Sequence, residues 1–457
     1  MMTESQRAAL AEYAAVKGQC PARERLAALF DDGVYTETGS NLRAGENLAG
    51  VVTAYGYIGG TPAYAFSQDS TVMKGAVSLA HSAKICKMFE LAARNGVPVV
   101  GIYDSCGAFV EDGADALNAY SDILLSMGSL SGVVPMVSVI SGVCAGTMAM
   151  IASSADFSVI TEGAELYLDA SGNNASAESA AKSGAVSAYA KTDAEAMDTV
   201  RRYLSLMPRN NLSPLPEFEF DAPVSAAFDN AENAAESIAD AGSILEVYGE
   251  YGTASYTALC TVSGVTAGIA ATNKTKDKLT SADCSKIARF VRLCDAYSIP
   301  VITVADTEGF DLQGADMVRA GAALAGAYAE ASCAKIALVS GKACGMAYIA
   351  FAGRNVAADA VYALPEAVIA PMDPVSAAEF LYHDKLKGAD DLAAARTQIA
   401  KEYAENEGSA FAAAAKGAAD EVVTAENVRA AVASVLDVTA GKRLNKRLPK
   451  KHNILPL

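Results

Sequence analysis

The most constraining feature of this sequence is an internal repeat. The run Ser-Ala-Lys-Ile at 82–85 and the apolar run at 97–104 recur at 284–287 and 299–306, so that 84→286 and 104→306 both give an offset of 202. A second block, Ser-Gly-Val-Cys-Ala-Gly at 141–146, recurs as Ser-Gly-Lys-Ala-Cys-Gly at 340–345, an offset of 199. Matched blocks at nearly constant spacing indicate two copies of one structural unit.

Each copy alternates a helix with a short apolar strand. Apolar residues three and four positions apart form a helical stripe, which Gly96 ends and Pro98 follows. The stripe consists of Ile85, Met88, Phe89, Ala92 and Ala93 in the first copy and of Ile287, Phe290, Val291 and Cys294 in the second. The runs after each stripe are short and β-branched, which is typical of parallel strands buried on both faces. This pattern predicts an α/β fold with right-handed crossovers.

The boundary between the copies is marked by composition. Four prolines fall within 208–223, and an Ala/Glu/Asp-rich stretch follows at 224–242. We therefore expect an N-terminal domain over residues 1–215 and a C-terminal domain over residues 225–457. Residues 384–440 have the pattern of a charged amphipathic helix.

Composition narrows the class of protein. The chain has 457 residues, a formal net charge of −17 and 52% hydrophobic residues, which favours a globular fold and argues against a nucleic-acid or anionic-membrane binder. Any phosphate ligand must therefore be bound by local basic residues or backbone amides. The nine cysteines are odd in number and form no C-x-x-C pair, so we expect free thiols, a cytoplasmic location and no metal site.

One long stretch, 123–155, carries no charged side chain and by length alone would admit a transmembrane helix. Its order argues otherwise. Residues 133–140 are typical of a buried strand, 141–146 of a glycine turn and 147–153 of the start of a buried helix. We therefore predict no membrane span.

In both copies a glycine turn leads from a strand into a helix, at 144–147 and at 344–347. N–H groups at a helix start lack intrahelical partners and lie at the positive end of the dipole, so they can bind an oxyanion. Glycine also allows close helix–strand packing, and both interpretations stay open here. The chain has no G-x-S-x-G, Walker A, H-E-x-x-H or post-strand G-x-G-x-x-G motif. If it is an enzyme, backbone dipoles and a cofactor must carry the chemistry.

Short segments along almost the whole chain have the order of a known family. They are 22–26, 32–33, 66–69, 71–72, 81–87, 104–108 and 142–146 in the first half, and 288–292, 299–300, 306–310, 327–331, 342–348 and 450–457 in the second. In this order they resemble the carboxyltransferase subunits of biotin-dependent acyl-CoA carboxylases and decarboxylases, of the propionyl-CoA carboxylase β and methylmalonyl-CoA and glutaconyl-CoA decarboxylase α types.

The resemblance implies tandem duplicated crotonase-type domains, each a ββα spiral, with acyl-CoA on the N-terminal side and biotin on the C-terminal side. It implies carboxyl transfer between a short-chain acyl-CoA thioester and biotin on a separate biotin carboxyl carrier protein. The implied assembly is a homo-oligomer, commonly a hexamer built as a trimer of dimers, whose active sites lie between subunits. A biotin carboxylase or a membrane decarboxylase subunit would be a further partner.

The same resemblance implies the site residues. The catalytic amides would be Gly146 and Thr147 for the thioester enolate, and Met346 and Ala347 for the ureido oxygen of biotin. The implied substrate-binding residues are Ser105, Cys106, Gly107, Ala108, Lys84, Lys87, Gly309, Phe310, Gly345 and Ile349. For the two lysines, candidates for CoA phosphates, a solvated helix face is the alternative.

The chain departs from the family pattern at several of these positions. Cys106 replaces a glycine, Glu308 a proline, and Thr147 and Met346 further glycines, while Ile349 implies an apolar pocket floor. Two loops also differ: 171–174 lacks the usual histidine, and the loop between residues 310 and 319 is shortened. These changes leave two alternatives, a biotin-independent crotonase-type acyl-CoA enzyme and a catalytically weakened scaffold subunit. They also leave the acyl group and the carboxylase or decarboxylase direction open.

Overall fold

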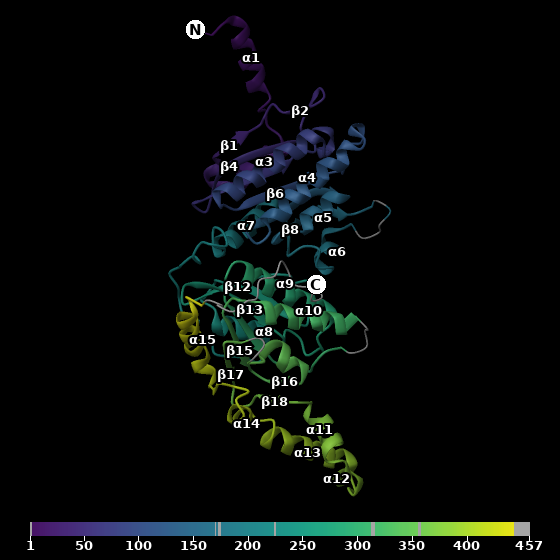
Figure 1. The fold of residues 1–457 in the computed structure, drawn as a ribbon, viewed down its shortest axis with the longest axis vertical. Coiled ribbons are helices and arrows are strands. Elements are labelled where there is room, and N and C mark those ends of the chain that lie inside the picture. The colour runs from purple at the N-terminus through teal and green to yellow at the C-terminus, as the bar shows by residue number, and fades with distance from the viewer. Residues whose placement is uncertain are drawn as a thin grey trace. The chain divides into compact units, whose positions relative to one another are not determined.

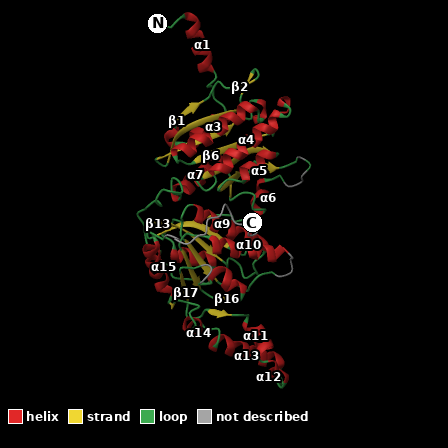
Figure 2. Cartoon of the chain, in the orientation of Figure 1, coloured by secondary structure: helices red, strands yellow, loops and turns green. Residues whose placement is uncertain are grey.

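The computed structural model describes residues 2–169, 171, 175–223, 225–311, 316–354 and 358–442. Parts of the two loops singled out above, 172–174 and 312–315, and the basic C-terminal segment 450–457 lie outside these residues. The chain divides into two compact units, Met1–Pro214 and Leu215–Leu457. Figures 1 and 2 show that each unit is built on a sheet with helices packed against it.

The first unit contains an eight-stranded sheet in the order β1-β4-β5-β6-β7-β8-β10, with β9 paired to β7. β1, β4 and β5 are antiparallel, and the strands from β5 onward are parallel. The strands are β1 (Tyr35–Thr38), β4 (Val51–Ile58), β5 (Thr61–Gln68), β6 (Val99–Ser105), β7 (Met136–Ala145), β8 (Phe157–Thr161), β9 (Glu165–Tyr167) and β10 (Ala188–Ala190), with a small hairpin of β2 (Arg43–Ala44) and β3 (Asn47–Leu48). The helices are α1 (Glu4–Ala15), α2 (Pro21–Leu29), α3 (Leu79–Asn95), α4 (Asp115–Leu130), α5 (Thr147–Ser153), α6 (Ala177–Lys182) and α7 (Asp193–Leu206).

The second unit contains a seven-stranded sheet in the order β11-β12-β13-β14-β15-β17-β19 and a separate β16–β18 pair. β11, β12 and β13 are antiparallel, and the remaining pairs are parallel. The strands are β11 (Leu245–Glu246), β12 (Tyr256–Val262), β13 (Val265–Ala271), β14 (Val301–Ala305), β15 (Lys335–Val339), β16 (Lys342–Cys344), β17 (Ala360–Ala363), β18 (Val368–Ala370) and β19 (Glu421–Val422). The helices are α8 (Ala231–Ile238), α9 (Ser281–Ala296), α10 (Asp316–Glu330), α11 (Pro374–Leu381), α12 (His383–Lys387), α13 (Leu392–Asn406), α14 (Ala410–Ala415) and α15 (Ala425–Thr439), and a π-helical turn covers Tyr348–Ala352.

The sequence repeat is a repeat of structure. The succession β4–β5–α3–β6–α4–β7 recurs as β12–β13–α9–β14–α10–β15, each time an antiparallel hairpin followed by parallel strands with helical crossovers. Figure 1 shows α3 beside α4 against the first sheet and α9 beside α10 against the second. An isolated β-bridge also repeats. Val77 pairs with Ala108 in the first unit, and Leu279 pairs with Phe310 in the second, so that each residue of the second bridge lies 202 positions after its counterpart.

The helical stripes are buried as predicted, apart from one residue. In α3, four of the five predicted residues lie in the core, whereas Ala93 is exposed. Gly96 caps this helix with φ 59°, a left-handed conformation that glycine adopts without steric cost. In α9 all four predicted residues are buried.

Two local predictions differ from the structure. Residues 141–145 are not a turn, because β7 continues to Ala145 and its last residues pair with β9. Residues 384–440 are not one helix but α13, α14, β19 and α15, after the end of α12. α13 ends just before Gly408 and α14 just before Gly417, and β19 pairs with β17 in the main sheet, a non-local pairing that helical periodicity does not reveal.

The charge-free stretch 123–155 is divided among α4, β7 and α5. Across the described residues, we find no helix with the length and apolar character needed to cross a bilayer.

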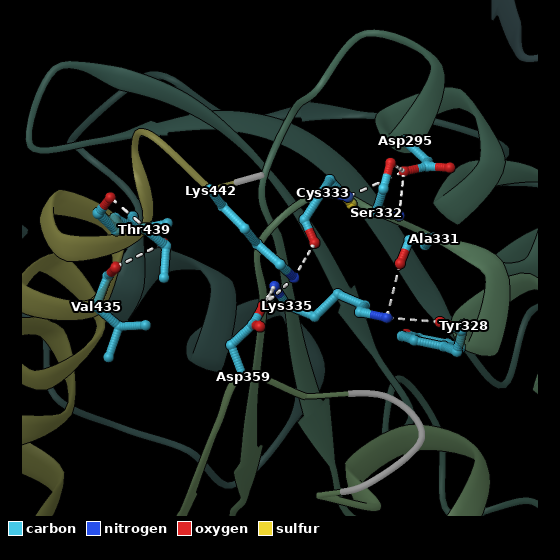
Figure 3. Close-up of polar contacts among 11 residues, drawn as sticks. Asp295, Tyr328, Ala331, Ser332, Cys333, Lys335, Asp359, Val435, Thr439 and Lys442 are labelled. Carbon is cyan, nitrogen blue, oxygen red and sulfur yellow. Dashed lines mark hydrogen bonds and ion pairs between the residues drawn. The ribbon is translucent and has the colours of Figure 1, made fainter. Parts of the chain in front are cut away.

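A polar cluster fixes the edge at which β15 begins (Figure 3). Lys335 is 8% exposed, and its Nζ donates to the carbonyl oxygens of Tyr328 and Ala331 near the C-terminus of α10, at 2.7 and 2.9 Å. Lys442, just after α15, forms an ion pair of 2.7 Å with Asp359 and donates to the Cys333 carbonyl. The buried Lys335 ammonium group therefore caps the C-terminus of α10, and the half-buried Lys442 connects the end of α15 to the segment before β15.

Candidate active sites at the strand ends

In the first unit the carboxyl ends of β6 and β7 bring two backbone segments together. Ser105 pairs with Cys144, so the loop 106–108 lies next to the turn into α5. A Cβ on Gly107 would lie 4.0 Å from the Ala145 carbonyl oxygen, which shows how closely the loop approaches the strand. Gly107 N–H donates to Ser105 Oγ at 3.2 Å and has φ 118°, a conformation that requires glycine.

The second unit repeats this arrangement. Gly309 N–H donates to Thr307 Oγ1 at 3.1 Å and has φ 101°. Thr307 N–H donates to the Lys342 carbonyl at 2.8 Å, which holds the loop 306–310 against β16. Helix begins directly after Gly345, as it does after Gly146 in the first unit.

The two glycines at these helix starts use their amides internally. Gly146 N–H donates to the Tyr167 carbonyl and Gly345 N–H to the Ala370 carbonyl, both at 2.9 Å. The family resemblance places the Gly146 amide in the first oxyanion hole, but this N–H group already donates to the Tyr167 carbonyl. A helix start leaves the next N–H groups without intrahelical acceptors.

Those next amides are Thr147 and Met148 in the first unit and Met346 and Ala347 in the second. Among the described residues the structure gives none of the four a hydrogen-bond acceptor. Thr147 is exposed and Met346 is 43% exposed, so both helix starts are open to solvent. Met148 was missed from the sequence, although the offset of 199 maps Ala347 onto it.

An aspartate supports each strand end, Asp104 buried in the first unit and Asp306 half-buried in the second, and neither was named from the sequence as a site residue. A Cβ on Gly142 would overlap the Asp104 carboxylate, and one on Gly341 would overlap the Asp306 carboxylate. The same contact therefore occurs in both units, with the aspartates 202 and the glycines 199 residues apart. Their equal placement in the repeat is the signal that could have identified them.

The two predicted phosphate-binding lysines lie in different environments. Lys84 is 6% exposed, its Nζ donates to the Val51 carbonyl, and burial lowers its pKa to about 8. Its repeat partner Lys286 is likewise buried, donates to the carbonyls of Gly252 and Ser255, and has a pKa lowered by burial to about 8. Lys84 is thus buried and does not lie on a solvated helix face, while its contact with a CoA phosphate stays a prediction. Lys87 is exposed and pairs with Glu90 at 2.9 Å.

His81 is part of the support beneath the first site. Asp104 N–H donates to Gln68 Oε1 at 3.0 Å, so the Gln68 amide nitrogen faces His81 Nε2 at 3.2 Å and donates to it. The imidazole proton then lies on Nδ1. Burial, with a smaller contribution from the Lys84 charge, lowers the His81 pKa to about 3, so this histidine is a neutral structural residue.

Apolar side chains lie near the second helix start. Phe310 and Phe351 are buried and stack with ring centroids 6.0 Å apart, whereas Ile349, two residues before Phe351, is 52% exposed. Glu308, which replaces the family proline, forms an ion pair of 2.9 Å with Lys342, whose Nζ also pairs with Asp373. Cys106, the corresponding departure in the first unit, is exposed and has a free thiol.

Two copies of an α/β unit, each ending a parallel strand in a turn that presents unpaired backbone N–H groups, match the duplicated crotonase-type fold that the family resemblance implies. Comparison with known proteins identifies the family. The profile of the carboxyl transferase domain matches residues 14–455, and the chain belongs to the carboxyl transferase family.

Similar proteins cover nearly the whole chain. The methylmalonyl-CoA decarboxylase α subunit of Propionigenium modestum is 33% identical over 96% of this chain and 94% of its own length. The methylmalonyl-CoA carboxyltransferase 12S subunit of Propionibacterium freudenreichii subsp. shermanii is 33% identical over 96% and 92%. The Cereibacter sphaeroides propionyl-CoA carboxylase β chain is 31% identical over 96% and 94%.

Solved structures agree. Transcarboxylase 12S, described as a hexamer with hydrolysed methylmalonyl-coenzyme A bound, has 30% identity and a TM-score of 0.88, with full coverage of both chains. A single-chain long-chain acyl-CoA carboxylase shares the fold, with a TM-score of 0.79. The predicted family, the duplicated crotonase-type fold and the class of biotin-dependent acyl-CoA carboxyltransferase are confirmed.

Proposed function

We propose that this chain is the carboxyltransferase subunit that moves a carboxyl group between a short-chain acyl-CoA and biotin on a separate carrier protein. The observation that carries the proposal is the pair of unpaired amides at the same place in both units, Thr147 with Met148 and Met346 with Ala347. Carboxyl transfer develops negative charge on two oxygens, one on each substrate, and two amide pairs match that need.

Each pair has a distinct role in this proposal. The amides of Thr147 and Met148 bind the thioester oxygen of acyl-CoA, so they stabilise the enolate form of its α-carbon. The loop residues Ser105 to Ala108 border the same oxygen, because Ser105 pairs with Cys144 at the end of β7. We assign Gly146 to the shape of the turn rather than to substrate binding, since its N–H is used by Tyr167.

The amides of Met346 and Ala347 bind the ureido oxygen of biotin. Biotin, when bound, supplies the ring nitrogen that carries the carboxyl group and accepts the α-proton. The donor set fits this group, because two backbone N–H groups match a single neutral carbonyl oxygen that gains negative charge. Gly309, Phe310, Gly345 and Ile349 shape the surrounding wall, of which Phe310 and Ile349 form an apolar part.

The relatives support the propionyl-CoA and methylmalonyl-CoA pair as substrates, and an oligomer. The three sequence relatives compared above are named for methylmalonyl-CoA or propionyl-CoA, and transcarboxylase 12S is described as a hexamer. We propose the same substrates and a hexameric assembly here, with a biotin carboxyl carrier protein and either a biotin carboxylase or a membrane decarboxylase subunit as partners. All nine cysteines are free, which supports a cytoplasmic location.

The test is carboxyl transfer from methylmalonyl-CoA and malonyl-CoA to free biotin, followed by mass spectrometry of both products. We expect transfer that requires biotin. Turnover of acyl-CoA without biotin would indicate the biotin-independent enzyme. Oligomers of normal stability that show no turnover, and no thermal shift with acyl-CoA or biotin, would indicate a scaffold subunit.

A further inference from the structure

Arg25, on α2, links three segments of the first unit. Its Nη1 forms an ion pair of 2.9 Å with Asp104 Oδ2, and its Nη2 donates to the Ser141 carbonyl at 2.9 Å. Its Nε lies 3.4 Å from Asp193 Oδ2, at the start of α7. The Arg25 side chain is 13% exposed, so one planar, nearly buried group holds β6, β7 and α7 at fixed spacing.

The two strand contacts lie directly before the proposed acyl-CoA site. Asp104 is two residues before the loop 106–108, and Ser141 is six residues before Thr147. The Asp104 carboxylate also accepts from Ser70 Oγ at 2.8 Å and packs against Gly142. A shift of this carboxylate would therefore move both segments that flank the Thr147 amide.

The second unit supports the equivalent aspartate in a different way. Asp306 accepts from Lys342 N–H at 2.8 Å and from the Asn273 side-chain amide at 3.2 Å. Among the described residues it has no ion pair, since Lys342 Nζ pairs with Glu308 and Asp373 instead. The two halves thus keep the same aspartate and glycine but use a cation in one half and neutral donors in the other.

We infer that Arg25 is a positioning residue for the first site only, acting through Asp104 and the Ser141 carbonyl on the helix start at Thr147. That this site binds acyl-CoA rests on the proposed function. The contacts alone carry the other part of the inference: Arg25 orders the loop 106–108 and the segment 141–147 at the end of β7, and it does not order their counterparts in the second unit. Asn273 is the corresponding residue for the second unit and provides a matched control.

Hydrogen exchange by mass spectrometry tests the inference on the full chain without reference to activity. In Arg25→Met we expect peptides covering 104–110 and 141–153 to exchange about tenfold faster than in wild type, while those covering 306–311 and 340–352 are unchanged. Asn273→Ala should give the opposite pattern. Unchanged exchange in the first-unit peptides, or equal acceleration in both units, would overturn the inference.

Arg25→Lys guards against a variant that fails to fold, because it keeps the charge but loses the planar fork that joins Asp104 to Ser141. It should accelerate exchange in the same two peptides, by a smaller factor. With free biotin as acceptor, Arg25→Lys should lower kcat/KM for acyl-CoA and leave KM for biotin unchanged, whereas equal changes in both would contradict a positioning role. Absence of transfer by the wild type would refute the proposed function, and the exchange data would still decide the role of Arg25.

Discussion

Replacement of His81 by glutamine should remove about 2 kcal/mol of the stability that the wild type loses between pH 7.5 and 5. The imidazole is fully buried and its pKa is lowered to about 3, against an ordinary value of 6.5. Below pH 6.5 the unfolded chain binds a proton at this residue that the folded chain does not. Folding is therefore disfavoured as pH falls, and the stability is fully present only above pH 6.5.

The size of the effect follows from the two pKa values. Each pH unit below 6.5 costs about 1.4 kcal/mol until the folded pKa is reached, so 1.5 units down to pH 5 amount to about 2 kcal/mol. Histidine is the side chain whose ordinary pKa lies inside this window, and the chain has only three, of which His452 lies in the C-terminal segment. Glutamine can still accept from Gln68 without taking up a proton.

The measurement is the free energy of urea unfolding at pH 7.5 and pH 5, followed by far-ultraviolet circular dichroism. The stability difference between wild type and His81→Gln should change by about 2 kcal/mol between the two pH values, with the wild type losing more. His383→Gln is the control, because His383 lies exposed on α12 and its loss should leave the wild-type dependence intact. Equal pH dependence in wild type and His81→Gln would refute the assignment of His81 as a neutral buried residue.

Three further substitutions test the packing and the caps. Gly142→Ala should lower the unfolding free energy by about 1–3 kcal/mol, because its Cβ would overlap the Asp104 carboxylate, whereas Gly128→Ala, with open space around it, should be neutral or stabilising. Lys286→Met should abolish a gain of about 2 kcal/mol that the wild type shows between pH 8 and 10, where the buried amine is already neutral but the unfolded one still binds a proton. Thr280→Ala should cost about 1 kcal/mol in urea unfolding, since its side chain accepts from the first turn of α9.

The sequence predicted the fold well where periodicity and repetition agree. Stripes at helical spacing, with Gly96 and Pro98 as end signals, located α3, and the offset of 202 then located α9. The strands β6 and β14 follow from their β-branched runs in the same way. These elements are fixed by local pattern and by burial on both faces, which is the information that a sequence carries most directly.

Pairing between segments far apart in the sequence cannot be predicted from local periodicity. The end of β7 looks like a glycine turn, and only its pairing with β9 makes it a strand. The same pairing region explains the revised oxyanion hole, because Gly146 N–H is used by Tyr167. Likewise, Lys84 would be expected at the surface, because lysine side chains are mostly exposed. It is buried instead, and its Nζ donates to the Val51 carbonyl, a contact that no local pattern reveals.

The contact between Asp104 and Gly142 recurs between Asp306 and Gly341. It restricts the substitutions that these four positions can accept during evolution. A side chain at either glycine collides with its aspartate, so the glycine cannot change first without distortion. A smaller residue must replace the aspartate before the glycine is released, and that first step gives up the hydrogen bonds that the carboxylate accepts. Loss of the pair therefore requires two successive substitutions, of which the first is destabilising. We expect the pair to persist after most other residues shared by the two halves have diverged. In more diverged members of this fold, an aspartate at one strand end and a glycine at the next should serve as fixed points for aligning one half with the other.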